Sequence, residues 1–152
     1  MNKLLSEIGW EREDVYITNI VKRRPPNNRD PLPEEIEAYK PFLARQIEIL
    51  NPTVIATLGC FSMNYFLPLA KITRDQGKLF QTNGLTLYPL FHPAAGLRDP
   101  GTLKALRESF MRLPSVVAKT KAEIPPKFRS VIVPTKPIAR RKKTEPPQET
   151  LF

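Results

Sequence analysis

The sequence predicts an α/β protein, with a three-layer α/β/α fold around a mainly parallel sheet. Strand-like and helix-like segments alternate along the chain, which is the order typical of such layers. The strand-like runs are short, apolar and rich in β-branched residues, whereas the helix-like runs repeat their apolar residues at helical spacing. At 152 residues, 41% of them hydrophobic, the chain is long enough for one domain with a sizeable core.

The amino-terminal part is expected to hold a helix, a strand, a loop and a second helix. Residues 2–9 show helical spacing and end at Gly9, a residue favoured at helix ends. Residues 14–21 are β-branched and aromatic, which predicts the first strand. After a proline-rich loop, residues 33–51 predict a long helix, with Pro41 as a kink or a break because proline lacks the helical N–H. The expected apolar face of this helix comprises Ile36, Phe42, Leu43, Ile47 and Leu50.

Two further strand and helix pairs follow. Residues 53–59 predict a short apolar strand, which turns tightly into a short helix over 60–67. Residues 85–91 predict the third strand, and 102–113 an amphipathic helix. The segment between these pairs, 68–80, is expected to be looser.

The carboxyl-terminal part, residues 114–152, is predicted to be a disordered basic tail that follows a domain of residues 1–113. After position 114 the chain has nine Lys or Arg against three Asp or Glu, six prolines and few residues able to form a core. The charge peaks in "ARRKK" at 139–143. Such a run is either a solvated tail or a contact for an anionic partner, most commonly nucleic acid.

Two classes of protein are disfavoured. No window of about 18 apolar residues suggests a membrane span, and the amino terminus lacks the apolar stretch and cleavage site of a signal peptide. We therefore expect a cytoplasmic protein without membrane contact. The single cysteine, Cys60, excludes an internal disulfide and any site built from several thiolates of this chain. We expect Cys60 itself to be a small core or half-buried residue.

Three positions that follow predicted strands are expected at one edge of the sheet: Asn19, Gly59 and His92. Right-handed crossovers bring the carboxyl ends of parallel strands to one edge, and ligands of open parallel sheets bind there. His92 is the only histidine of the chain, and Pro93 after it restricts the backbone. This edge is therefore the candidate site.

Four stretches together resemble the later two-thirds of a type-4 uracil-DNA glycosylase, a group from thermophilic bacteria and archaea that carries a 4Fe-4S cluster. They are "VYITNIVKRRPPNNRDPLPEEIEAYKPFL", "VIATLG", "KITRDQGK" and "PLFHPAAGLRDP", and the match covers about residues 2–113. The resemblance implies hydrolysis of the N-glycosidic bond between deoxyribose and uracil in single- or double-stranded DNA, for base-excision repair. The uracil would be flipped out of the stack into a pocket.

The resemblance also implies roles for particular residues. Asn19 would read the uracil edge, because an amide offers both a donor and an acceptor. His92 would hydrogen-bond uracil O2 and stabilise the negative charge that develops on the departing base. Leu97 and Arg98 would form a wedge that fills the gap left in the duplex by the flipped nucleotide.

Arg24 and its loop neighbours Arg23 and Arg29 are further candidates, for contact with DNA phosphates. Simpler alternatives stay open for every position of the site. The histidine would otherwise be an ordinary structural or surface residue, and the asparagine a turn former. Leu97 would otherwise anchor its loop to the core, and the arginine after it would be a solvated charge.

The sequence departs from the family at its amino terminus. The family has a further segment there, with a motif that positions the attacking water, an aromatic residue that stacks on uracil, and a strand inside the sheet. That strand would lie between the strands expected over 14–21 and 53–59, so the first strand of the family is missing here. We expect its loss to leave unpaired strand edges and an exposed apolar seam.

The second departure concerns the cluster. Two of the family's four cluster cysteines match Arg23 and Tyr39 here, and the other two belong to the missing segment. Iron–sulfur clusters need thiolate ligands, which neither a guanidinium nor a phenol replaces. We therefore expect no cluster, other cofactor or metal in this chain.

The third departure is the terminal sequence "QETLF". Gln148, Leu151 and Phe152 have the spacing of a short motif that binds the sliding clamp PCNA, similar to those that end archaeal repair proteins. The glutamine would bond to backbone groups of the clamp, the two apolar side chains would fill a hydrophobic pocket, and the tail would act as a tether. The alternative is an ordinary frayed terminus.

Two functions follow from these observations. The first is a uracil-DNA glycosylase, which we expect to be weak or inactive as this chain alone because the water-positioning motif is missing. The alternative is a catalytically inactive homologue that binds DNA or is tethered to a sliding clamp, and that keeps the loop and the tail without the chemistry.

Overall fold

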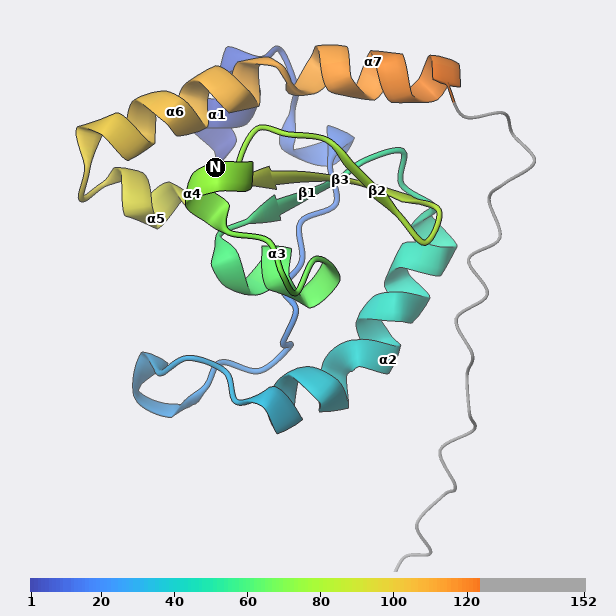
Figure 1. The fold of residues 1–152 in the computed structure, drawn as a ribbon, viewed down its shortest axis with the longest axis vertical. Coiled ribbons are helices and arrows are strands. Elements are labelled where there is room, and N and C mark those ends of the chain that lie inside the picture. Colours follow the sequence, from blue (N-terminus) through green and yellow to red (C-terminus); the bar gives the residue numbers. More distant parts are fainter. Residues whose placement is uncertain (124–152) are drawn as a thin grey trace, which may run out of the picture.

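The computed structural model describes residues 1–123, which form an α/β fold (Figure 1). The α/β class predicted from the sequence is confirmed. Within these residues no helix is both long enough and apolar enough to cross a membrane. The helices are α1 (Asn2–Glu7), α2 (Pro33–Leu50), α3 (Cys60–Phe66), α4 (Ile72–Asp75), α5 (Pro93–Gly96), α6 (Pro100–Met111) and α7 (Leu113–Glu123), with short 3-10 helices at Arg12–Asp14 and Pro26–Asn28.

The sheet has three strands in the order β1-β3-β2. β1 and β3 are parallel, with Leu58 opposite Leu90, so their carboxyl ends lie together. β2 pairs with β3 in the antiparallel direction. β3 is thus the central strand. The strands are β1 (Ile55–Leu58), β2 (Phe80–Thr82) and β3 (Leu85–Leu90).

Helices lie on both sides of this sheet. In Figure 1, α6 and α7 lie on one side and α3 lies on the other. Tyr88 and Leu90 of β3 share one face, because alternate residues of a strand point the same way. Burial of each large apolar side chain in such a core stabilises the fold by about 1.5–3 kcal/mol. The buried cluster comprises Leu5, Tyr88, Leu90, Leu106, Phe110 and Leu113.

The strand predicted over 14–21 is not formed, and this expectation is wrong. Residues 12–14 are a 3-10 helix and residues 15–21 are irregular. β1 forms one edge of the sheet, and within the described residues no strand lies between β1 and residues 15–21 to pair with them. Strand-like composition is insufficient because the backbone groups of a strand need a neighbour. Tyr16 and Ile17 are 58% and 39% exposed, in agreement with the expected open edge and apolar seam.

α2 is continuous through Pro41, and Asn51 ends it with a positive φ of 44°. Its apolar face differs from the expectation. Leu43 is buried, but Phe42 and Leu50 are 58% and 46% exposed. In Figure 1 the helix lies to one side of the rest of the fold, and Leu43 is its only buried residue.

A hairpin lies where the looser segment was expected to lead into the third strand. Asn83 and Gly84 connect β2 to β3 with φ values of 48° and 74°. Positive φ at both central positions is typical of a two-residue hairpin turn whose twist matches the strands.

The chain continues as a helix beyond the expected domain boundary at residue 113. Pro114 lies in the first turn of α7, where its missing N–H is not needed. Val116 packs against the buried cluster, and Thr120 is 3% exposed. The segment expected to be a tail therefore begins with a packed helix. Residues 124–152, which include the basic run and the terminal motif, lie outside the described part.

Candidate active site

The carboxyl ends of β1 and β3 carry Gly59 and His92 to the same edge of the sheet, as expected. Leu58 and Leu90, the last residues of the two strands, lie opposite one another. The N–H of Gly59 donates a hydrogen bond of 2.8 Å to the carbonyl of Leu90. The two loops that follow these strands are therefore joined where they begin.

His92 is the N-cap of the short helix α5. Its Nδ1 accepts a hydrogen bond of 3.1 Å from the N–H of Ala94, and its carbonyl accepts one of 2.9 Å from Ala95. Pro93 occupies the first helical position, where its φ suits the helix. A ring nitrogen that accepts a hydrogen bond carries no proton, so the proton of the neutral imidazole is on Nε2. The side chain is exposed, and it presents Nε2–H as its donor.

Gly59 permits the close approach of His92. Its φ is +83°, and a Cβ at this position would lie 3.1 Å from the Cβ of His92. Any larger residue would be strained and would press on the histidine. The glycine is thus part of the geometry of the site.

The other side of β3 is held by the segment after α4. The N–H of Gly77 donates to the carbonyl of Pro89 at 2.7 Å. The backbone nitrogen and carbonyl of one strand residue point to the same side of the strand. The nitrogen of Pro89, which has no proton, therefore faces the side of Gly77, beyond the last residue of β3 that pairs with β2. The hydroxyl of Tyr88 donates to the Ser109 carbonyl at 3.0 Å, and the Ser109 hydroxyl donates to Gln76 at 3.0 Å. β1, the segment after α4 and α6 therefore all hold the end of β3 that precedes His92.

The turn of α4 is closed by a buried carboxylate. Asp75 is 4% exposed and accepts hydrogen bonds from the Lys71 N–H at 2.9 Å and from Arg74 Nε and Nη2 at 2.8 and 2.6 Å. These bonds, that of the Arg74 guanidinium above all, hold the pKa of Asp75 well below its ordinary value. The carboxylate fixes the turn that leads to Gly77.

The segment after His92 leaves Leu97 exposed. Gly96 is buried, and a Cβ there would lie 3.1 Å from the Cα of Leu103 on α6. α5 thus packs on α6 through this glycine. Leu97 is 85% exposed, so the alternative that it anchors the loop to the core is wrong. Arg98 beside it is also exposed. Their role as a DNA wedge stays a prediction.

Asn19 does not end a strand, because the strand expected over 14–21 is not formed. It is exposed and belongs to the irregular segment, and within residues 1–123 no hydrogen bond joins it to His92. Its carbonyl accepts a hydrogen bond of 2.7 Å from Lys22 Nζ. Lys22 was not indicated by the sequence, because its partners become apparent only in the folded chain.

The arginines of the preceding loop differ in their availability. Arg24 is exposed. Arg29 makes a bidentate pair with Glu35, with both N–O distances 2.8 Å. This arginine therefore stabilises the start of α2, and its guanidinium is already engaged. Contact of Arg24 with phosphates stays a prediction.

The two residues at the positions that the resemblance assigns to cluster ligands do not fit an iron–sulfur cluster. Arg23 is exposed, and the half-buried Tyr39 packs its ring 6.2 Å from that of Phe42. Neither side chain offers a thiolate. In the part of the chain that the structure describes, no group of three or more His, Cys, Asp or Glu side chains is placed to hold a metal ion. Cys60 is exposed at the start of α3, so its expected burial is wrong.

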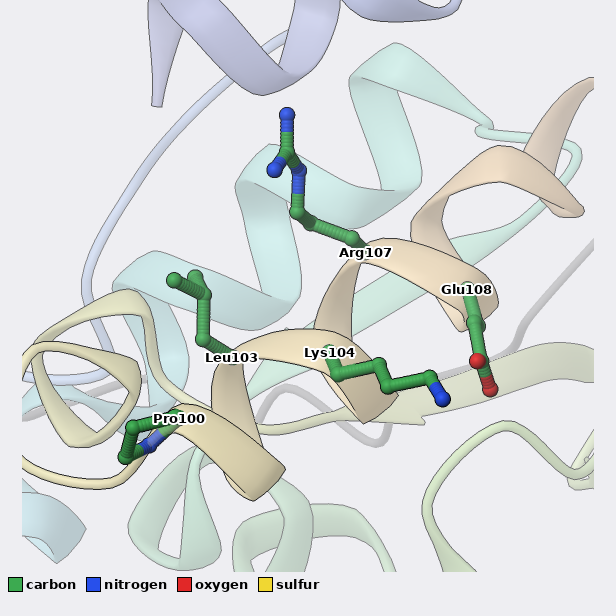
Figure 2. Close-up of a pocket in the computed structure, with 5 residues that line it drawn as sticks. All are labelled: Pro100, Leu103, Lys104, Arg107 and Glu108. Atoms are coloured by element: carbon green, nitrogen blue, oxygen red, sulfur yellow. The ribbon is translucent and has the colours of Figure 1, made fainter.

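A depression of about 310 Å³ lies on the outer surface of α6 (Figure 2). None of the predicted site residues lines it. Arg107 at its edge binds Glu7 of α1 through N–O distances of 2.5 and 3.1 Å. All lining residues belong to α6, so this depression is too open to enclose a base and is not the candidate site. Its lining residues are Pro100, Leu103, Lys104, Arg107 and Glu108.

The features on this edge define an α/β protein with an exposed, oriented histidine after a parallel strand. The family model of the uracil DNA glycosylase superfamily matches residues 1–113. The chain belongs to this superfamily.

Within the superfamily the chain is similar to type-4 enzymes. It is 42% identical to the Type-4 uracil-DNA glycosylase of Saccharolobus solfataricus over 123 residues, covering 74% of this chain and 57% of the relative. It is 47% identical to that of Thermotoga maritima over 102 residues, covering 65% and 53%. A Type-5 uracil-DNA glycosylase of Pyrobaculum aerophilum is 30% identical over 89 residues, covering 57% and 39%. The chain thus spans little more than half the length of these type-4 relatives.

Proposed function

We propose that the chain carries base-binding and base-releasing residues of a uracil-DNA glycosylase that acts in base-excision repair. The observation that carries the proposal is the hydrogen bond of 3.1 Å from the Ala94 N–H to His92 Nδ1, which makes Nε2 the outward donor. Membership of the superfamily and similarity to type-4 enzymes support uracil in DNA as the substrate.

The proposed chemistry needs a donor at the departing base. When the C1′–N1 bond breaks, its electron pair leaves with uracil, so negative charge develops on the base and is shared with O2. Nε2–H of His92 would donate to O2 and stabilise this charge. Water adds to C1′ and loses a proton, and a proton from the solvent neutralises the departed uracil anion, which leaves free uracil and an abasic site. Removal of one such donor typically costs about 10²–10³-fold in rate.

Other residues would select and expose the base. We propose that the amide of Asn19 reads the uracil edge, that Leu97 fills the gap in the duplex, and that Arg98 and Arg24 contact phosphates. The 85% exposure of Leu97 supports the second of these roles, because a wedge must reach out of the protein surface.

The proposal is tested by uracil release from a single-stranded oligonucleotide with one uracil. The purified chain is compared with His92→Ala and with Ser115→Ala, an exposed position on α7. Release that is lost in His92→Ala and kept in Ser115→Ala would support the proposal. Because release by this chain alone is expected to be slow, it is measured over long times with the protein in excess over DNA. No release by the folded wild-type chain under these conditions would contradict the proposal, and DNA binding without release would favour the inactive DNA-binding homologue.

We also propose that this chain holds no iron–sulfur cluster at the positions of the family's ligands. The support is the guanidinium of Arg23 and the phenol of Tyr39, neither of which ligates iron in such clusters. Iron analysis and the visible absorption spectrum of protein purified without oxygen test this proposal. Stoichiometric iron with cluster absorption would contradict it.

A sliding clamp is the proposed second partner, bound by Gln148, Leu151 and Phe152. The support is their spacing at the end of a basic segment, which would raise the local concentration of the protein on DNA. Binding to PCNA should be lost in Phe152→Ala and kept in Thr150→Ala, because Thr150 is not one of the three motif residues. Equal binding of both variants would contradict it. We also propose a cytoplasmic location, in which the chain would meet both DNA and a sliding clamp.

A further inference from the structure

The segment that carries Asn19 pairs with no strand of the sheet that residues 1–123 form. Residues 15–21 are irregular and run as coil toward the loop before α2 (Figure 1). Thr18 and Asn19 are both exposed. A residue that reads a base by hydrogen bonds must be held in one position, since loose placement lowers both affinity and selectivity. Other contacts must therefore fix this segment.

Lys22 supplies such contacts. Its Nζ donates to the Thr18 hydroxyl, to the carbonyl of Asn19 and to Oε1 of Gln46, each at 2.7 Å. An ammonium group has three protons, so all of them are used. Two of the bonds close the turn around Asn19, and the third joins this turn to α2, 24 residues further along the chain.

Lys22 is an exposed residue whose partners are neutral oxygens, whereas some other exposed lysines pair with carboxylates. Lys40, for example, binds Glu37 within its own helix. Hydrogen bonds from an ionised donor are stronger than neutral ones, so three of them restrain the segment effectively. Although the residue as a whole is exposed, partial desolvation of the ammonium lowers the pKa of Lys22, in agreement with its three hydrogen bonds to the protein.

We propose that Lys22 is a positioning residue that holds Asn19 for recognition of the base. The inference rests on the proposed function, in which Asn19 reads uracil. Lys22 acts through Asn19 and its turn and does not itself contact the base. Its loss should therefore weaken base selection and leave the donor at His92 in place.

The test compares Lys22→Met with Lys40→Met in the full chain. Methionine keeps the length of the side chain and removes every donor. We expect amide hydrogen exchange over residues 16–22 to be about tenfold faster in Lys22→Met, because charge-assisted bonds are lost. Exchange in β3 and α6 should stay unchanged, and Lys40→Met should match the wild type throughout. Equal exchange over 16–22 in all three proteins would overturn the proposal.

A second readout separates positioning from a merely structural role. The preference for uracil over cytosine in single-stranded DNA should fall about tenfold in Lys22→Met, mainly through KM. Lys22→Arg, which keeps the charge and several donors, should restore part of it. Faster exchange with an unchanged preference would overturn the positioning role. If the wild type releases no uracil, the proposed function fails, and the preference is then measured as a ratio of oligonucleotide affinities.

Discussion

Gly59 and His92 are in contact across the carboxyl edge of the sheet, so that a Cβ on Gly59 would lie 3.1 Å from the Cβ of His92. The contact depends on the parallel pairing of β1 and β3, which sets Leu58 opposite Leu90. The position of the imidazole is therefore determined by two loops at once. Chemistry at His92 should respond to substitutions on either loop.

Gly59→Ala should reduce both stability and uracil release. A φ of +83° disfavours any residue with a Cβ, at a cost of about 1–3 kcal/mol, and the new methyl group would press on His92. Gly84→Ala is the matched control, because Gly84 has a φ of +74° with no atom within 4 Å of a Cβ. It should lower the free energy of unfolding similarly and leave the release rate per folded molecule unchanged. Denaturant unfolding measures the stability of each variant, and uracil release is then compared per folded molecule. Equal release rates for the two variants would show that the contact has no role in catalysis.

His92→Asn should separate the capping role of the histidine from its chemistry. Asparagine is a favoured N-cap, so it can accept the bond from the Ala94 N–H that Nδ1 accepts now. We expect stability close to the wild type, whereas His92→Ala should lose about 1 kcal/mol of it. Uracil release should fall about 10²–10³-fold in both variants. Thermal unfolding and single-turnover release measure the two effects, and near-normal release by His92→Asn would contradict the donor role of Nε2.

Leu97→Ala should impair release from duplex DNA more than release from single-stranded DNA. The side chain is 85% exposed, so its truncation should change stability by less than about 0.5 kcal/mol. A wedge is needed only where a base must leave the stack. Leu69→Ala, at a leucine that is 93% exposed, provides the control. The same ratio of duplex to single-strand rates in both variants and the wild type would refute the wedge.

Acid should weaken the attachment to α2 of the loop that carries Arg29. The Arg29 guanidinium, together with the Leu32 N–H, lowers the pKa of Glu35 to about 2. In the unfolded chain this pKa is about 4.3, so the unfolded state binds the proton more readily. The contribution of the carboxylate is thus fully present above about pH 4.3 and is lost as the pH falls toward 2.

Glu35→Gln should therefore flatten the stability profile between those pH values. Glu34→Gln, which removes the adjacent carboxylate of the first turn, is the control and should leave the slope nearly intact. Denaturant unfolding at a series of pH values measures the effect, and low salt makes it clearest because Arg29 and Glu35 are partly exposed. Identical slopes for the two variants would rule out this pair as the cause.

Several elements were predictable because their signals are local. Periodicity and end residues predict the helix before Gly9, the long helix after Pro33, and the strand and helix on either side of Gly59. The hairpin turn at Asn83 and Gly84 also had a local signal, since Asn-Gly between strand-like residues is typical of this turn. The looser segment was expected over 68–80 and the third strand over 85–91, so no turn was predicted at these two residues.

Other features depend on which segments meet in space. Residues 14–21 have strand-like composition, but strand formation needs a partner, and none lies beside β1 in the described residues. The exposure of Cys60 and Phe42 likewise depends on what packs against α3 and α2. The loop motif around His92 indicated the site, yet the contact with Gly59 required the parallel pairing to be known.

The amino-acid sequence alone was sufficient for the α/β class, the family and the placement of His92 after a strand. Each of these depends on local order and motif, which the chain carries without reference to distant residues. Only the folded structure shows the hydrogen bonds of Lys22 to Asn19 and Gln46, the packing of α7 and the exposure of Leu97. Burial and hydrogen bonding belong to pairs of groups, and the partners of these groups are distant in sequence and adjacent only after folding.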